Sequence, residues 1–308
     1  MLNWIRTLAL VATTSFLAAC GGGDDHPSST LAVAQGDARF SILVEAVNAA
    51  GLADTLAGPG PLTVFAPTND AFAALLTELG VTKDALLANK PLLTAVLTYH
   101  VLPAEVERAQ VPLGQPVTTV QGGIFKVDAV GQNLVITDGR NRTATITATD
   151  VQAGNGVVHV IDRVILPADK TIVQTAQALP QFSILVEAVV AADLAGALSG
   201  SGPFTVFAPT NDAFAALLAE LGVSKDALLA DKALLTQVLT YHVVPARVLK
   251  AQVPVGTPIT SLQGQTFTID ATLAITDQRG RKAGIAATDV LASNGVIHVI
   301  DKVILPRP

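Results

Sequence analysis

An internal repeat constrains the fold of this chain more than any other feature of its sequence. Residues 61–104 and 203–246 are identical at 37 of 44 positions, and residues 155–167 recur at 294–306. The period near 140 residues is much longer than the roughly 20–50 residues of a solenoid repeat. Each unit is also long enough to bury a core of its own. The repeat therefore predicts two complete domains in tandem, residues 31–168 and 169–308.

Composition excludes several classes of protein. Half of the 308 residues are hydrophobic, only 4% are aromatic, and the formal net charge is −6. High apolar content with modest charge is not typical of a disordered chain. An acidic chain without a Lys/Arg cluster is not expected to bind nucleic acid, and its few aromatic side chains offer little surface for stacking bases. The sequence also lacks a run of about 20 apolar residues, which excludes a multi-pass membrane protein.

The first twenty residues resemble a bacterial lipoprotein signal. A short start with one positive charge, Met1–Arg6, precedes the apolar run Thr7–Ala19, which suits the core of a secretory signal. That run ends in Leu-Ala-Ala before Cys20, the only cysteine of the chain. The resemblance to the lipobox implies cleavage before Cys20, a lipid on its sulfur and acylation of the new amino terminus. The alternative is an ordinary signal peptide with an unrelated cysteine near its cleavage site.

The segment after Cys20 fits an anchored protein. We expect residues 1–19 to be the signal and residues 20–30 to be a flexible tether, because Gly, Asp, Pro and Ser dominate it. Several acyl chains give durable membrane anchoring, whereas one chain binds only reversibly. Gly21, directly after the cysteine, resembles the pattern that sorts lipoproteins to the outer membrane in organisms with two membranes. The predicted location is the cell envelope, at the outer membrane with either a periplasmic or a surface-facing orientation, or outside the cell.

Each unit is predicted to contain helices first and strands afterwards. Apolar side chains at helical spacing predict helices at residues 40–47, 71–79, 82–88 and 91–100. A short strand at 62–66 precedes the second of these helices. Short Val, Ile and Thr runs then predict strands at 116–120, 125–128, 134–137, 143–147 and 157–166. Helices clustered before strands, without βαβ alternation, indicate an α+β fold with an antiparallel sheet or sandwich.

Three motifs resemble those of fasciclin domains. They are TVFAPTNDAF at 63–72 and 205–214, the Tyr-His pairs at 99–100 and 241–242, and NGVxHVIDxVILP at 155–167 and 294–306. The resemblance covers both units almost end to end. It implies that each domain is a β-sandwich wedge with a cluster of helices, and that the protein acts in cell adhesion or matrix contact. No Arg-Gly-Asp sequence occurs, so the animal type of integrin recognition is not implied.

The same motifs supply the candidate interaction residues, which are Thr68, Asn69, Asp70, Tyr99, His100 and His159 in the first unit and Thr210, Asn211, Asp212, Tyr241, His242 and His298 in the second. A metal site would join the two histidines of a unit, with Asp70 or Asp212 as a further ligand. The histidines are far apart in sequence and lack the close pairing typical of zinc sites. We expect buried histidines bonded to the backbone or to a capping carboxylate, helix-capping roles for Asn69 and Asp70, and no metal or cofactor.

The sequence shows no recognisable catalytic constellation. A phosphate loop, a G-x-S-x-G elbow and a serine in a triad context are all missing. The leading hypothesis is a non-enzymatic, lipid-anchored protein that mediates adhesion to a protein or polysaccharide matrix component. The second is a binder of an apolar small ligand, carotenoid- or lipid-like, in a groove between helices and sheet. The third is an envelope hydrolase, which would need a polar cleft uniting Tyr99, His100 and an acid.

Overall fold

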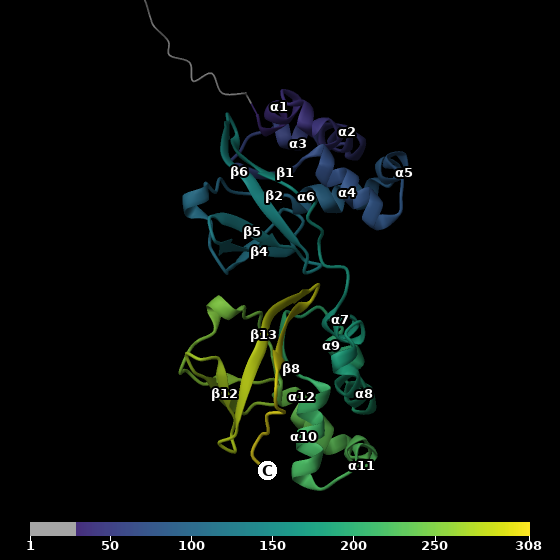
Figure 1. The fold of residues 1–308 in the computed structure, drawn as a ribbon, viewed down its shortest axis with the longest axis vertical. Helices are drawn as coiled ribbons and strands as arrows, with labels where there is room; N and C mark the ends of the chain where they lie inside the picture. The colour runs from purple at the N-terminus through teal and green to yellow at the C-terminus, as the bar shows by residue number, and fades with distance from the viewer. Residues whose placement is uncertain (1–28) are drawn as a thin grey trace, which may run out of the picture.

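The structure is a computed structural model that describes residues 29–308. Two domains follow one another along the long axis, and each places its sheet on one side and its helices on the other (Figure 1). The predicted signal and the anchor Cys20 lie outside the described residues. Domain 1 begins slightly earlier than expected, because Ser29 caps the first helix and Thr30 is buried. Both residues therefore belong to the folded domain and not to the tether.

The helices of the two domains correspond one to one. Those of domain 1 are α1 (Thr30–Gln35), α2 (Ser41–Ala50), α3 (Ala53–Ala57), α4 (Asn69–Leu79), α5 (Lys83–Ala88) and α6 (Lys90–Tyr99). Those of domain 2 are α7 (Ile172–Gln177), α8 (Ser183–Ala191), α9 (Ala195–Leu198), α10 (Asn211–Leu221), α11 (Lys225–Ala230) and α12 (Lys232–Tyr241). The four helices predicted for the first unit are present within a few residues, whereas α1 and α3 were not expected from the sequence.

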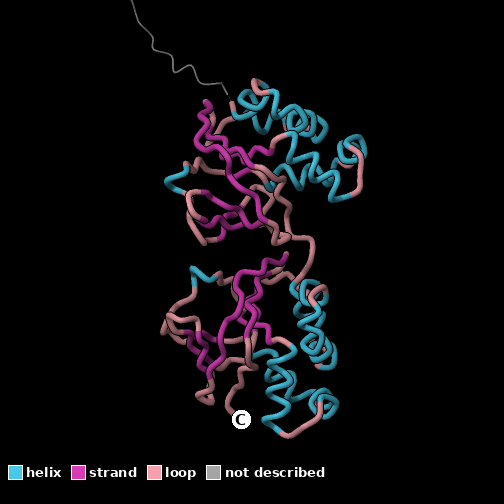
Figure 2. The backbone as a smooth tube through the Cα atoms, viewed as in Figure 1, coloured by secondary structure: helices cyan, strands magenta, loops and turns pink. Residues whose placement is uncertain are grey.

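Each domain has seven strands. Those of domain 1 are β1 (Leu62–Pro67), β2 (Val101–Leu102), β3 (Pro116–Thr118), β4 (Ile124–Val130), β5 (Asn133–Thr137), β6 (Thr143–Ala153) and β7 (Gly156–Ile161). Those of domain 2 are β8 (Phe204–Pro209), β9 (Val243–Val244), β10 (Ile259–Thr260), β11 (Thr266–Ile269), β12 (Ala274–Thr276), β13 (Lys282–Ala292) and β14 (Gly295–Ile300). The order is β2-β1-β7-β6-β5-β4-β3 in domain 1, and domain 2 repeats it. Figure 2 shows the strands gathered opposite the helices in both domains.

The α+β class is confirmed, but the sheet is mixed and not purely antiparallel. Strand β1 pairs with β7 in parallel over its whole length, from Leu62 opposite Gly156 to Pro67 opposite Ile161. Strand β8 pairs with β14 in the same way. Both partners are short and almost entirely buried, and they are apolar except for Thr63 and His159, which is close to the pattern of strands buried on both faces in parallel pairs. The alternation of the other strands gave no sign of this long-range pairing.

The sheet has an apolar core on each face. Val64 and Ala66 of β1 belong to the core cluster shared with the helices, while Phe65 between them belongs to a second cluster on the strand side. Successive side chains of a strand point to opposite faces, so β1 joins the two cores. Domain 2 repeats this division. The motif residues of β1 and β7 therefore lie at the centre of each domain.

The two domains also contact each other directly. Lys126 of β4 forms an ion pair with Asp289 of β13, and the side chain of Asn141 bonds to the backbone of Leu291. Ile124 packs with buried apolar residues of domain 2. Within residues 29–308, no helix is long and apolar enough to cross a membrane.

Candidate functional site

The tyrosines of the Tyr-His pairs are held inside the fold. Tyr99 is fully buried at the end of α6; its hydroxyl donates to the carbonyl of Ile124 and accepts from the amide of Gly139 at 2.8 Å. Burial raises the pKa of Tyr99 well above its usual value. Tyr241 bonds to Thr266 and Gln278 in the same way, and burial raises its pKa to about 12. These phenols join the last turn of a helix to two strand ends, and they are not acids at neutral pH.

The histidines that follow the tyrosines are buried and use both ring nitrogens internally. Nδ1 of His100 lies 2.7 Å from the carbonyl of Val96, and Nε2 accepts from the amide of Ile165 at 3.1 Å. Because Nε2 accepts, Nδ1 carries the proton and donates to Val96. Burial lowers the pKa of His100 to about 4, and His242 has the same two bonds and the same lowered pKa of about 4. Neither ring has a nitrogen free for a metal or a substrate.

The strand histidines are arranged with the opposite tautomer. Nδ1 of His159 accepts from the amide of Asp150 at 3.3 Å, and Nε2 lies 2.8 Å from the carbonyl of Val106. His298 repeats both contacts, with the amide of Asp289 and the carbonyl of Val248. Burial lowers the pKa of both rings. No cluster of three His, Cys, Asp or Glu residues within 29–308 is placed to hold a metal ion.

The Thr-Asn-Asp segment fixes the starts of two helices at once. Oγ1 of Thr68 accepts from the amide of Ala71 and caps α4. The Asn69 side chain reaches a different helix, because its Oδ1 accepts from the amide of Ile42 at 3.0 Å, and α2 has no cap of its own. Asp70 is exposed in the first turn of α4, where a negative charge favours the helix. Thr210, Asn211 and Asp212 repeat the arrangement, although the sequence had suggested that Asn69 caps its own helix.

Two further polar residues organise each domain and were missed by the sequence reasoning. Oδ1 of Asn155, in the turn between β6 and β7, accepts from the amide of Thr30, and Nδ2 donates to the carbonyls of Leu56 and Gly58 at 2.9 and 2.8 Å. Asn294 makes the same three bonds in domain 2. The role of this side-chain amide in holding α1 and α3 was not predicted from the sequence. The available signal was the recurrence of this asparagine at the same place in both copies of the motif.

The second missed residue is a buried aspartate. Asp138 is only 1% exposed and accepts from the amides of Arg140, Arg142 and Leu166, and it also forms an ion pair with Arg142 at 2.9 Å. Asp277 accepts from the three equivalent amides of domain 2. The repeated pattern Asp-x-Arg-x-Arg at 138–142 and 277–281 could have indicated this turn. The carboxylate fastens the end of the last motif to the sheet.

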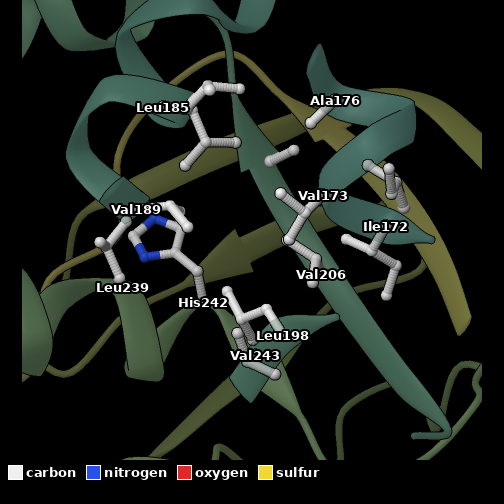
Figure 3. A pocket seen from close by; sticks show the side chains of 13 residues that line it. Ile172, Val173, Ala176, Leu185, Val189, Leu198, Val206, Leu239, His242 and Val243 are labelled. Atoms are coloured by element: carbon white, nitrogen blue, oxygen red, sulfur yellow. The ribbon is translucent and has the colours of Figure 1, made fainter. Parts of the chain in front are cut away.

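An apolar cavity lies between the helices and the sheet in each domain. The one in domain 2 is lined by side chains of α7, α8, β8 and β14, with the ring of His242 at its wall (Figure 3). Its volume is about 30 Å³, and that of the equivalent cavity in domain 1 is about 20 Å³. A single water needs roughly 10–15 Å³ by this measure, and drug-sized ligands occupy roughly 300–1,000 Å³ pockets. These cavities are much smaller than a carotenoid.

The two domains share one α+β architecture and one set of internal hydrogen bonds, and these define a single class of domain. A family model described as the fasciclin domain matches residues 38–167 and 180–306, and the chain therefore belongs to the fasciclin family. The domains of this family are generally non-enzymatic adhesion domains. The match covers most of both predicted domains. The motif residues His100, Tyr99 and Asn69 all have structural roles in them.

Several relatives place the chain within this family. Protein sll1483 of Synechocystis sp. is 49% identical over 150 residues, which are 48% of this chain and 79% of that protein. Transforming growth factor-beta-induced protein ig-h3 of Sus scrofa is 31% identical over 251 residues, 81% of this chain and 35% of that protein. Human periostin is 28% identical over 261 residues, 83% and 29% respectively. The chain thus spans about a third of the length of these animal relatives.

A solved structure was also found. It is the FAS1 domain pair from the insect cell adhesion molecule fasciclin I, with 19% identity and a TM-score of 0.43. The match covers 86% of this chain and 95% of that one.

Proposed function

We propose that this chain is a lipid-anchored protein of the cell envelope whose two fasciclin domains mediate adhesion to a protein or polysaccharide matrix component. The observation that carries the proposal is the internal use of the motif residues. The polar side-chain groups of the motif residues form hydrogen bonds with the backbone of their own domain, as seen at Tyr99, His100, Asn69 and Asn155. The family motifs therefore stabilise the fold of each domain, and the matrix component is bound by the exposed surface of the domains.

The same observation supports a non-enzymatic role. A general acid or base must reach a substrate, and its pKa works best near the operating pH. The rings of His100 and His242 are fully enclosed, their nitrogens are bonded to the backbone, and burial lowers their pKa to about 4. A hydrolase that used Tyr99, His100 and an acid would also need a polar cleft around them. The space beside His100 is lined almost entirely by apolar side chains.

The proposed anchor is Cys20, nine residues before the first folded residue, Ser29. Replacing it separates the anchor from the folded domains. Mass spectrometry of the wild type should find acyl chains on an amino-terminal peptide that begins at Cys20, and Cys20→Ser should lose them. A wild-type amino-terminal peptide without acyl chains would count against lipid anchoring.

Adhesion is tested in cells and then with purified protein. Deleting the gene should reduce biofilm formation or surface attachment, and wild-type protein should restore it. The Cys20→Ser protein should restore it poorly, because it lacks the anchor. A pull-down of envelope and matrix components with the Cys20→Ser chain then identifies the partner. Unchanged attachment of the deletion strain on several different surfaces would contradict the adhesive function.

A second candidate function is the binding of an apolar small ligand, and the two matching cavities between helices and sheet favour it. A ligand larger than a few atoms would have to displace the short helix α7, whose Ile172, Val173 and Ala176 line the cavity (Figure 3). Protein purified under native conditions should then carry a lipid or pigment that solvent extraction and mass spectrometry detect. Protein without any co-purifying apolar molecule would argue against this function.

A further inference from the structure

The contact between the two domains includes a buried ion pair. Nζ of Lys126 in domain 1 lies 3.0 Å from Oδ2 of Asp289 in domain 2, and the two side chains are 14% and 3% exposed. The other carboxylate oxygen of Asp289 accepts from the amide of Lys250 at 2.7 Å, which fixes its orientation. A carboxylate at this depth needs a cationic partner. Lys126 therefore completes a site that domain 2 presents.

An asparagine completes the polar part of the contact. Oδ1 of Asn141 accepts from the amide of Leu291 at 2.6 Å, and its Nδ2 donates to the carbonyl of Leu291 at 3.0 Å. The side-chain amide of Asn141 therefore bonds to both the N–H and the C=O of Leu291 in β13, as the backbone of a neighbouring strand would. Asn141 has a φ of 62°, in the left-handed region that Asn tolerates better than most residues. The turn holds the amide towards domain 2.

An apolar cluster accompanies these bonds. Ile124 of domain 1 packs with Leu249, Leu291 and Val296 of domain 2, and all four side chains are at least 90% buried. We call Ile124, Lys126 and Asn141 the tail face of domain 1, and Leu249, Asp289 and Leu291 the head face of domain 2. The contact is heterologous, because one face of the module meets a different face of the next.

Heterologous contacts create an assembly problem for a repeated domain. If both domains carried both faces, the head of domain 1 would accept the tail of domain 2 from another copy, and the chain would grow into an open filament. The offsets between the repeats show which residues occupy the two outer faces. The outer tail of domain 2 has Thr266, Thr268 and Gly280 at the positions of Ile124, Lys126 and Asn141, and the outer head of domain 1 has Glu107, Asp150 and Gln152 at the positions of Leu249, Asp289 and Leu291.

Five of these six positions differ between the repeats, although the 61–104 block matches its copy at 37 of 44 positions. At the outer tail, the ammonium group, the amide group and the isoleucine are all missing. At the outer head, a charged and a polar side chain replace two leucines. Asp150 keeps its positive φ and its bond to the amide of Arg108. Docking the outer faces would bury Asp150 without a cation and Glu107 without a partner, which is strongly unfavourable.

We propose that the two domains form an order-specific, closed pair. The tail face of domain 1 recognises the head face of domain 2 within one chain, and the residues of the two outer faces prevent a second copy from adding at either end. The pair is then a rigid unit that presents the exposed surfaces of both domains at one fixed spacing. This inference concerns assembly and does not depend on the proposed adhesive function.

The first experiment removes the contact with residues that the fold already accepts. In a Cys20→Ser background, the triple variant Ile124→Thr/Lys126→Thr/Asn141→Gly gives domain 1 the tail residues of domain 2. Gly replaces Asn141 without strain, because the equivalent Gly280 also has a positive φ of 75°. Spin labels at Leu79→Cys and Leu221→Cys, on the exposed ends of α4 and α10, report the spacing of the domains.

The parent should give a single narrow distance distribution between the labels, and the triple variant a broad one. The matched control is Lys83→Thr, which breaks the exposed ion pair with Glu45 on domain 1. It should leave the distribution narrow. Hydrogen exchange protection of both domains should remain in the triple variant, which separates loss of docking from unfolding. A triple variant with the parent's narrow distribution would overturn the role of the tail face.

The second experiment creates the missing contact. The variant Thr266→Ile/Thr268→Lys/Gly280→Asn/Glu107→Leu/Gln152→Leu rebuilds both outer faces, and light scattering measures its mass from micromolar concentrations to about 1 mM, the effective concentration of a short linker. The parent, the three-residue half and the two-residue half should remain monomeric, while the full variant should form oligomers that grow with concentration. Oligomers of the parent, or a folded full variant that is monomeric at about 1 mM, would refute the closed-pair proposal.

Discussion

Acidification should destabilise this protein through its buried histidines. In the folded state, burial lowers the pKa of His100 and His242 to about 4, while an unfolded chain has ordinary histidines with a pKa of about 6.5. Below about pH 6.5 these histidines are protonated in the unfolded chain. In the folded protein, His100 and His242 become protonated only near pH 4. The stability that these neutral rings contribute is therefore fully present above pH 6.5 and is lost as the pH falls towards 4.

The magnitude follows from the difference between the two pKa values. Between pH 7.5 and pH 5, each of these histidines should lower the free energy of unfolding of its own domain by about 2 kcal/mol. Typical domains are stable by only about 5–15 kcal/mol. His159 and His298 act in the same direction, because burial lowers the pKa of both.

Urea denaturation at several pH values between 5 and 7.5 measures the effect directly. The variants are His100→Gln and His242→Gln, which keep a polar side chain of similar reach but do not titrate. Each should be less stable than the wild type at pH 7.5, because its two backbone partners are less well bonded. Near pH 5.5, the unfolding of each variant should also take up about one proton fewer than the unfolding of the wild type. A variant with the wild-type pH slope, or an NMR titration of either ring near pH 6.5 in the folded protein, would refute the reasoning.

Four further substitutions test the polar framework and the core. Asn294→Ala should lower the free energy of unfolding by about 3–5 kcal/mol, and Asn155→Ala by less, because two of the three bonds of Asn294 are buried whereas all three of Asn155 are only partly buried. Equal losses in urea denaturation would contradict this order. Tyr99→Phe should cost about 1–3 kcal/mol by leaving a buried carbonyl and amide unpaired, which thermal unfolding measures. The Leu235 side chain is only 2% exposed, so Leu235→Ala should lower the free energy of unfolding by about 2–5 kcal/mol. A loss below about 1 kcal/mol would show that the core collapses into the space that the substitution leaves.

The parts of the fold that depend on local pattern could be predicted from the sequence. The helix at Asn69–Leu79 has a capping threonine, apolar side chains at helical spacing and a glycine at its end, and each signal acts within a few residues. Helices α1 and α3 have only six and five residues and were missed, whereas α5, which is also six residues long, was predicted to begin at its capping Thr82. Strand β6 was predicted to end at residue 147 and extends to Ala153, because two irregularities in its register break the alternation of apolar side chains.

The parts of the fold that depend on distant partners could not be predicted from the sequence. Nothing near Leu62 indicates that its strand pairs in parallel with one that begins at Gly156. The roles of Asn155 and Asn69 were hidden for the same reason, since each side chain bonds to a helix elsewhere in the chain. A side chain that caps its own helix leaves a local trace in the sequence, whereas one that caps another helix does not.

The parallel pairing of β1 with β7 affects how the chain folds. The centre of domain 1 cannot form until almost all of that domain is available, and such long-range pairing slows folding. Strands β7 and β14 differ only at Val158 and Ile297, so β14 offers β1 a nearly equivalent partner during that delay. Tandem domains this similar are prone to exchange strands with one another. Completion of domain 1 before β14 emerges would avoid this error during synthesis, whereas refolding of the whole chain from denaturant exposes both choices at once.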